Sequence, residues 1–515
     1  MSAVITADAA PRSSAVNPWL IAPLVAVAAF MEIMDISIAN VALPHIAGSL
    51  AASQDESTWI LTSYLVTNAI VMPISGWLAD TFGRKRVFLI CIAGFTSASL
   101  LCGIAPNLPT LMLLRAVQGA AGGGLQPLGQ AILNDAFPPA KRGMATALYG
   151  MAAVVAPIMG PVLGGWMTDD YSWRWIFLIN VPIGTLLLFT MAVLLTDPPG
   201  SVRRTVGVDG WGFAFTALAL GALQIVLDRG QEDDWFGSQM ITTLILLSAL
   251  GFILLIWWEL RQVHPMVDVR LLLQKEFLIA FAIMGAGIGV LMFASSFLIP
   301  AYTQQLLGYT AFKAGLAIAP GGLITLIMMP VVGQLVSRVD LRLLAGVGLA
   351  LSGLATWWMT NFDLDVSLGV IMLARAVQSS GLAFLFIPVS TLAFRGVPAA
   401  RMNSASALIN LARNLGGSIG LSGAAVFLER RAQFHQSRIV ESLQPLNPAF
   451  PDFAQQMGGM GAPGTLDRIY ETALQQAAML SYLDVFKLLG LMSLALIPLV
   501  FLLKAGKGGG AVSLH

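Results

Sequence analysis

Long apolar runs recur along almost the whole 515-residue chain. A helix that crosses a bilayer needs about 20 mainly apolar residues to span a hydrocarbon core of about 30 Å. About fourteen runs meet this requirement: 19–43, 58–79, 86–104, 109–133, 143–168, 173–196, 209–229, 238–258, 277–302, 312–336, 341–360, 367–391, 403–429 and 481–503. The long connection at about 430–480 is polar and rich in Gln, Pro and Gly. The pattern predicts an all-α integral membrane protein with about 14 transmembrane helices.

Composition makes lipid the expected solvent. Hydrophobic residues form 57% of the chain and charged residues 11%, with a mean hydropathy of +0.79, whereas soluble domains carry about 25% charged residues. The net charge of +1 and the absence of a long basic stretch give no reason to expect nucleic acid. No Cys/His cluster indicates a metal, and no Gly-x-x-x-x-Gly-Lys-Ser/Thr motif indicates ATP. We therefore expect neither a cofactor nor an enzyme.

The basic residues of the loops predict how the chain lies in the membrane. With a cytoplasmic N-terminus, loops on that side hold roughly 17 of the 28 Lys and Arg, and the short opposite loops hold about three. An even number of spans then places both termini in the cytoplasm and the 430–480 loop outside.

An internal repeat divides the chain into two halves. The segment Arg115-Ala-Val-Gln118 recurs as Arg375-Ala-Val-Gln378, 260 positions later, and each copy is followed by an apolar helix and a basic loop. Parallel halves are a transporter architecture, with substrate handled at their interface. The predicted divisions are a tail at 1–18, a six-helix half at 19–200, two inserted helices at 201–262, a second six-helix half at 263–503 and a tail at 504–515.

Two carboxylates fall within the first apolar run. Glu32 and Asp35 are three residues apart, so they share one helix face. Acidic residues at bilayer depth are costly and usually face a cavity or a partner. Their mutual repulsion favours a bound proton on one or both, which is what a proton carrier needs. The alternative is that they are solvated helix ends near the headgroups.

Further polar residues lie within other spans. Arg115 is expected to seek a carboxylate or several carbonyl groups, because an arginine stays charged; a purely structural arginine is the alternative. Its repeat mate, Arg375, is expected to be structural. The candidates for the substrate cavity are Asn40, Gln118, Gln126, Gln130, Asn410 and Arg413.

Several segments together resemble the major facilitator superfamily and, within it, the fourteen-helix drug:proton antiporter branch of EmrB-type exporters. The segments are Met34-Asp35-Ile-Ser-Ile-Ala-Asn40, Gly76-x-Leu-x-Asp80-x-x-Gly83-Arg84-Lys85, Arg115-x-x-Gln118-Gly119, Gly160-Pro161-x-x-Gly164-Gly165 and Trp173-Arg-Trp-Ile-Phe-Leu-Ile-Asn180. The resemblance implies efflux of hydrophobic compounds across the inner membrane in exchange for protons, with Asp35 as the carrier, Glu32 as a helper and Arg115 as the charge that drives proton release.

The resemblance also implies two moving parts and two partners. Asp80, Gly83, Arg84 and Lys85 would form a cytoplasmic latch, with Asp80 bound to the other half and the two basic residues in water. The glycines around Pro161 would mark a bendable or tightly packed seam between the halves. EmrB-type pumps work with a periplasmic adaptor and an outer-membrane channel, for which the 430–480 loop is either a docking surface or a connector. Other expectations left open are an exporter of one lipid, fatty acid or siderophore-like molecule, and a membrane platform for assembly.

Overall fold

The computed structural model describes residues 17–196, 209–443, 450, 455 and 465–504, and every regular element in these residues is a helix. The first half comprises α1 (Pro18–Ser49), α2 (Gln54–Phe82), α3 (Arg84–Gly103), α4 (Leu108–Gly122), α5 (Leu125–Ala136), α6 (Pro139–Asp170), α7 (Trp175–Leu178) and α8 (Asn180–Leu194). The inserted segment comprises α9 (Gly210–Thr216), η1 (Ala217–Gly221), α10 (Ala222–Arg229), η2 (Trp235–Gly237) and α11 (Gln239–Glu259).

The second half begins after α11. It comprises η3 (Val269–Leu273), α12 (Lys275–Ala282), η4 (Ile283–Val290), α13 (Leu291–Gln305), α14 (Ala311–Leu335), α15 (Leu341–Trp358), η5 (Met359–Asn361), α16 (Leu368–Phe394), η6 (Ala399–Arg401), α17 (Met402–Ser442), α19 (Thr465–Ala495) and α20 (Ile497–Phe501). The predicted tails at 1–18 and 504–515 and the boundary at 200 lie almost entirely outside the described residues.

Hydropathy and length identify most of the predicted spans in the described residues. Eleven helices are long and apolar enough to cross a membrane, and α6, bent by 43°, makes a twelfth. The remaining predicted spans, 109–133 and 403–429, are occupied by α4 with α5 and by α17. The all-α membrane class is therefore confirmed, whereas the number fourteen stays a prediction.

The predicted span 109–133 is interrupted near its middle, where other helices come very close. A turn at Gly123 and Gly124 separates α4 from α5. A Cβ atom on Gly123 would lie 2.8 Å from the carbonyl oxygen of Asn68 on α2, and one on Gly124 would lie 2.7 Å from the Cys91 sulfur on α3. Glycine is thus required for this approach.

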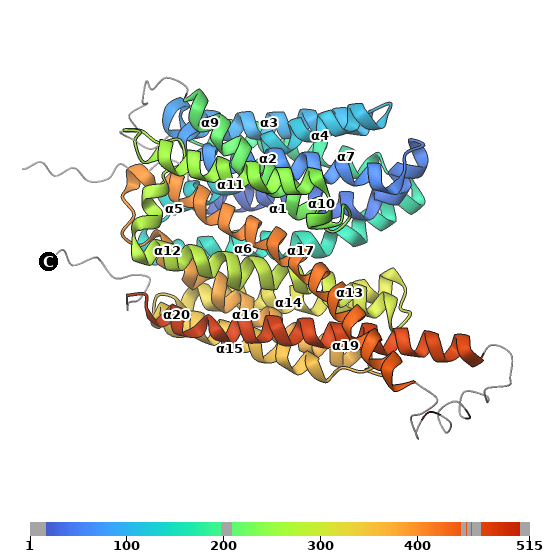
Figure 1. Cartoon of the computed structure of the whole chain (residues 1–515). Coiled ribbons are helices and arrows are strands. Elements are labelled where there is room, and N and C mark those ends of the chain that lie inside the picture. The colour runs from blue at the N-terminus through green and yellow to red at the C-terminus, as the bar shows by residue number, and fades with distance from the viewer. Residues whose placement is uncertain (1–16, 197–208, 444–449, 451–454, 456–464, 505–515) are drawn as a thin grey trace, which may run out of the picture.

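The two halves lie side by side, with α6 and α17 at the boundary between them. In Figure 1 the blue and cyan helices of the first half occupy one side and the yellow to red helices of the second half the other. Across the boundary α6 packs on α14 and α17 packs on α2. The inserted helix α10 contacts both α2 and α17, so α17 borders all three parts of the chain.

The long polar connection is more helical than its composition suggested. Rather than a loop over 430–480, α17 continues to Ser442 and α19 begins at Thr465. With 41 residues α17 is about 61 Å long, twice the hydrocarbon thickness. Its extension is fastened to α19 because Arg431 Nε donates to Asp484 Oδ2 at 2.6 Å and His435 Nε2 lies 2.7 Å from the same oxygen.

Candidate functional site

Asp35 on α1 forms a buried ion pair with Arg115 on α4. Two amides also donate to Asp35 Oδ1: Gln118 Nε2 at 3.0 Å and Asn180 Nδ2 at 2.8 Å. Asp35 is 1% exposed and Arg115 is fully buried. A buried charge is tolerated when it is paired and hydrogen-bonded, and both conditions are met at this pair.

Aromatic rings enclose the arginine of this pair. The Arg115 guanidinium carbon lies 4.2 Å from the Tyr64 ring centre and 5.5 Å from that of Phe177. Arg115 also donates to Gln118 Oε1 at 2.9 Å and to the Ile60 carbonyl oxygen at 3.4 Å. The planar guanidinium suits such stacking and forked donation better than a lysine would.

Glu32, fully buried one turn before Asp35, has its own set of donors. Asn68 Nδ2 donates to Glu32 Oε1 at 3.0 Å, the Tyr64 hydroxyl donates to the same oxygen at 3.4 Å, and Gln126 Nε2 donates to Oε2. The other end of the Gln126 amide, Oε1, accepts from Arg413 on α17. One amide therefore links an acid of the first half to a cation of the second.

Helix α17 carries the polar contacts between the halves on one face. Asn403, Asn410, Arg413 and Asn414 are spaced by seven, three and one residues, which places them along one side of the helix. Asn410 Nδ2 donates to Gln130 Oε1 at 2.7 Å, next to the Arg413–Gln126 bond. We call the line formed by Asn403, Asn410, Arg413 and Asn414 the α17 seam.

At one end of the seam lies the predicted latch. Asn403 Nδ2, in the first turn of α17, donates to Asp80 Oδ1 at 2.6 Å. Beside it, a Cβ on Gly76 would lie 2.8 Å from the Ser404 backbone nitrogen. Across the boundary, a Cβ on Gly143 would lie 2.9 Å from the Gly333 carbonyl oxygen. The ends of the two halves are therefore in backbone contact here.

The two basic residues of this motif are partly buried and bonded within the first half, rather than free in water as expected. Gly83, with φ +92°, turns the chain from α2 into α3 and places Arg84 against α5. The Arg84 side chain is only 10% exposed and pairs with Asp135, while Lys85 Nζ donates to the Ala192 carbonyl oxygen at 2.7 Å. Both residues fasten α3 within the first half.

The glycines around Pro161 pack α6 against α1, so the prediction that they lie between the halves is wrong. A Cβ on Gly160 would lie 2.4 Å from Ser37 Oγ, and one on Gly164 would lie 3.2 Å from the Ile38 carbonyl oxygen. A Cβ on Gly165 would meet nothing within 4 Å. The predicted bend is present between Pro157 and Val162. The motif thus sets the contact between a bent helix and the helix of the two acids.

Comparison with known proteins places this geometry in a family. Residues 25–421 match the profile of the Major Facilitator Superfamily. The chain is 37% identical over 497 residues to the multidrug export protein EmrB of Escherichia coli (strain K12), covering 95% of this chain and 96% of that protein. The chain belongs to the major facilitator superfamily. It is therefore a multi-pass membrane protein, and the EmrB-type exporters that its motifs resemble are its relatives over nearly the whole length.

Other members of the superfamily give the same result for sequence and for fold. The fatty acid resistance protein FarB of Neisseria gonorrhoeae is 36% identical over 507 residues, covering 98% of this chain and 99% of that protein. The proton:xylose symporter XylE superposes with a TM-score of 0.59 at 13% identity, covering 96% of this chain and 97% of that one. The latter likeness shows the superfamily fold alone.

Polar residues within apolar runs, together with the superfamily motifs, predicted part of the polar network and missed the rest. Asp35, Arg115, Gln118, Glu32, Gln126, Gln130, Asn410 and Arg413 all lie in it. Asn40 is exposed and lies outside it. The residues missed are Tyr64, Asn68, Asn180 and Asn403. Asn68 could have been predicted, because it is a polar residue in the apolar run 58–79. Asn180 could have been predicted because it ends the quoted segment that begins at Trp173.

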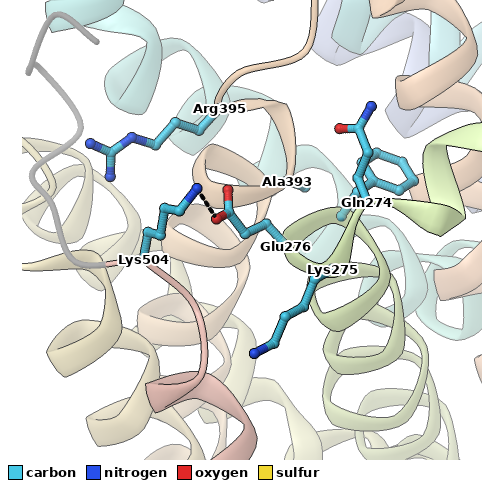
Figure 2. Close-up of a pocket in the computed structure, with 7 residues that line it drawn as sticks. Gln274, Lys275, Glu276, Ala393, Arg395 and Lys504 are labelled. Carbon is cyan, nitrogen blue, oxygen red and sulfur yellow. Dashed lines mark ion pairs between the residues drawn. The ribbon is translucent and has the colours of Figure 1, made fainter. Parts of the chain in front are cut away.

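Two pockets lie where helices end, and neither is lined by Asp35, Glu32 or Arg413. One, of about 310 Å³, is lined by Lys275, Glu276, Arg395 and Lys504, and Figure 2 shows Lys504 Nζ facing Glu276 Oε1, 2.8 Å away. The other, of about 230 Å³, is next to Asp80. Among the described residues no group of three or more His, Cys, Asp or Glu is arranged to hold a metal ion.

Proposed function

We propose that the protein exports hydrophobic drugs or toxic compounds across the inner membrane in exchange for protons, by alternating access of the two halves. The observation that carries the proposal is the Glu32–Gln126–Arg413 link. It connects an acid able to bind a proton with the surface on which the halves must separate. The names of the EmrB relatives support drug export as the activity.

Proton binding by Asp35 would change the charge balance around Arg115. The ionised carboxylate accepts from three donors; a neutral acid would leave Arg115 as an uncompensated buried cation, which is costly. Arg115 would then favour release of the proton once the site faces the other side. This makes Asp35 the carrier and Arg115 the residue that resets it.

Proton binding by Glu32 would act on the contact between the halves. Gln126 donates to the ionised Glu32 and accepts from Arg413, so each charge polarises the amide for the other. A protonated Glu32 weakens this chain of charge-assisted bonds and favours separation along the α17 seam. Closure at Asp80 and Asn403 corresponds to a cytoplasmic latch, which would be closed when the site faces outward.

The orientation and partners follow from the same reading. The basic loops favour both termini in the cytoplasm, at the end where Lys504 meets Glu276. The extensions of α17 and α19 would then project on the periplasmic side and offer a rigid surface for an adaptor protein that leads to an outer-membrane channel. Export of a fatty acid is the second candidate, favoured by the similarity to FarB.

A transport assay tests the proposal. The protein is reconstituted in liposomes with an imposed proton gradient, and transport of a fluorescent lipophilic cation is followed for the wild type, Asp35→Asn and Glu32→Gln. We expect Asp35→Asn to abolish gradient-driven transport and Glu32→Gln to lower it at least about tenfold, because a charge-assisted hydrogen bond contributes about 1.5–3 kcal/mol.

Asp228→Asn is the matched control. Asp228 is also a carboxylate within a span, but it lies in α10 and accepts from Thr62 away from the α17 seam. This variant should retain transport. Full gradient-driven transport by Asp35→Asn would refute the coupling role, and transport that ignores an uncoupler would show a facilitator.

A further inference from the structure

Equivalent residues of the two repeated halves form equivalent hydrogen bonds. Gln118 lies 83 positions after Asp35 and donates to it, and Gln378 on α16 lies 83 positions after Ser295 on α13 and donates to that hydroxyl at 2.9 Å. The repeat of 260 positions thus superposes Ser295 on Asp35 as well as Arg375 on Arg115. The second half keeps the arginine and the glutamine of the first-half site and has a serine in place of its carboxylate.

Arg375 is a buried cation without an acidic partner among the described residues. It is 5% exposed. Its donors go to neutral atoms: Nη1 to Gln378 Oε1 at 2.7 Å and Nη2 to Ser296 Oγ at 3.2 Å. Its Nε is buried and has no hydrogen-bond partner. The equivalent guanidinium of Arg115 is neutralised by Asp35, so the second site has one positive charge in excess.

A buried, uncompensated guanidinium with an orphaned N–H is a strong attractor for an anion. Serine is shorter than aspartate and uncharged, so no carboxylate of the described residues takes the position that Asp35 takes in the first half. We propose that Arg375, with Ser295 and Ser296 beside it, forms an anion-binding site that accepts the carboxylate of an amphiphilic substrate during the transport cycle.

This assignment rests on the proposed export function and narrows its substrate class. A carboxylate that binds Arg375 would complete in the second half the same pair that Asp35 completes in the first. The exporter would then accept hydrophobic acids besides lipophilic cations. A free chloride ion is also an anion that a guanidinium can bind. The experiment therefore distinguishes a substrate carboxylate from an inorganic anion.

The probe is a dansyl-labelled medium-chain fatty acid, titrated by fluorescence into the full-length protein in nanodiscs at a pH where it is ionised. Its methyl ester is the uncharged control. We expect the acid to bind the wild type about tenfold or more tightly than the ester, as a charge-assisted bond implies. Ser295→Asp supplies the missing carboxylate from the chain and should remove this preference, whereas Ser295→Asn, similar in size and neutral, should keep it.

Arg375→Gln is the second variant and should also remove the preference, with thermal unfolding reporting whether each variant is folded. Chloride that displaces the acid where gluconate does not would identify an inorganic anion as the occupant and overturn the assignment to substrate. Equal binding of acid and ester by the wild type, or equal losses in Ser295→Asp and Ser295→Asn, would overturn the site itself. Gradient-driven transport of a lipophilic cation by Ser295→Asp tests the export function separately.

Discussion

At the scale of the residue, Gln126 is distinctive because each end of its amide is hydrogen-bonded to a charged side chain. Its Nε2 donates to Glu32 and its Oε1 accepts from Arg413. A neutral amide carries its donor and its acceptor on separate atoms, so it can bond an anion at one end and a cation at the other. A carboxylate here would repel Glu32, and an apolar residue would remove one hydrogen bond from each of the two charges.

Replacement of Gln126 by Leu should therefore be costly. Two charge-assisted bonds, each contributing about 1.5–3 kcal/mol, are lost while Glu32 and Arg413 remain buried. We expect a lower unfolding temperature and transport reduced at least about tenfold. Gln224→Leu is the control, because Gln224 bonds the neutral Ser418 hydroxyl at 3.1 Å. If the two variants transport equally well, Gln126 does not relay charge between the halves.

At the scale of the element, the contact between α1 and α6 depends on one missing methyl group. In Gly160→Ala the new Cβ would meet Ser37 Oγ at 2.4 Å and Cβ at 2.5 Å, and overpacking of this kind costs about 1–3 kcal/mol. We expect lower thermal stability and slower transport, because α1 carries both acids. The measurements are unfolding temperature and efflux rate.

Gly165→Ala, on the same helix, is the control for that substitution. Its Cβ would meet nothing within 4 Å, and alanine favours the helix over glycine by about 1 kcal/mol, so no loss is expected. Ser37→Gly combined with Gly160→Ala removes the clashing atoms and should restore much of the stability. A failure of this rescue would mean that the glycine is needed for bending rather than for packing.

Features that depend on neighbouring residues could be predicted from the sequence. Apolar runs predicted most of the membrane-spanning helices, and the bend near Pro161 was predicted from residues within one turn of it. Contacts between distant segments were not accessible: Gln126 and Arg413 are 287 positions apart, and nothing local says that α6 meets α1 at Gly160. The extension of α17 was missed because Gln-rich and Arg-rich sequence reads as a loop in hydropathy, although both residues favour helix.

At the scale of the whole molecule, the two halves are in backbone contact at the end near Asp80. This contact identifies which state of the transport cycle the structure represents. Gly76 lies against Ser404 and Gly143 against Gly333, so the backbones of the two halves touch at these two points, beside the pocket next to Asp80. Alternating access requires these contacts to open in the other state. The structure therefore corresponds to the state in which this end is closed.

A crosslink across this end should arrest the cycle. With Cys91 and Cys102 replaced by Ala, we would introduce cysteines at Asp80 and Asn403, whose side chains are 2.6 Å apart, and join them with a short bifunctional thiol reagent that a reductant cleaves. Transport should stop on crosslinking and return on reduction, because the halves can no longer separate there. The control places the two cysteines at Arg84 and Asp135, which form an ion pair within the first half. Crosslinking this control variant should leave its transport rate unchanged. Continued transport with Asp80 and Asn403 joined would show that this end does not open during the cycle, and the alternating-access scheme would have to be abandoned for this protein.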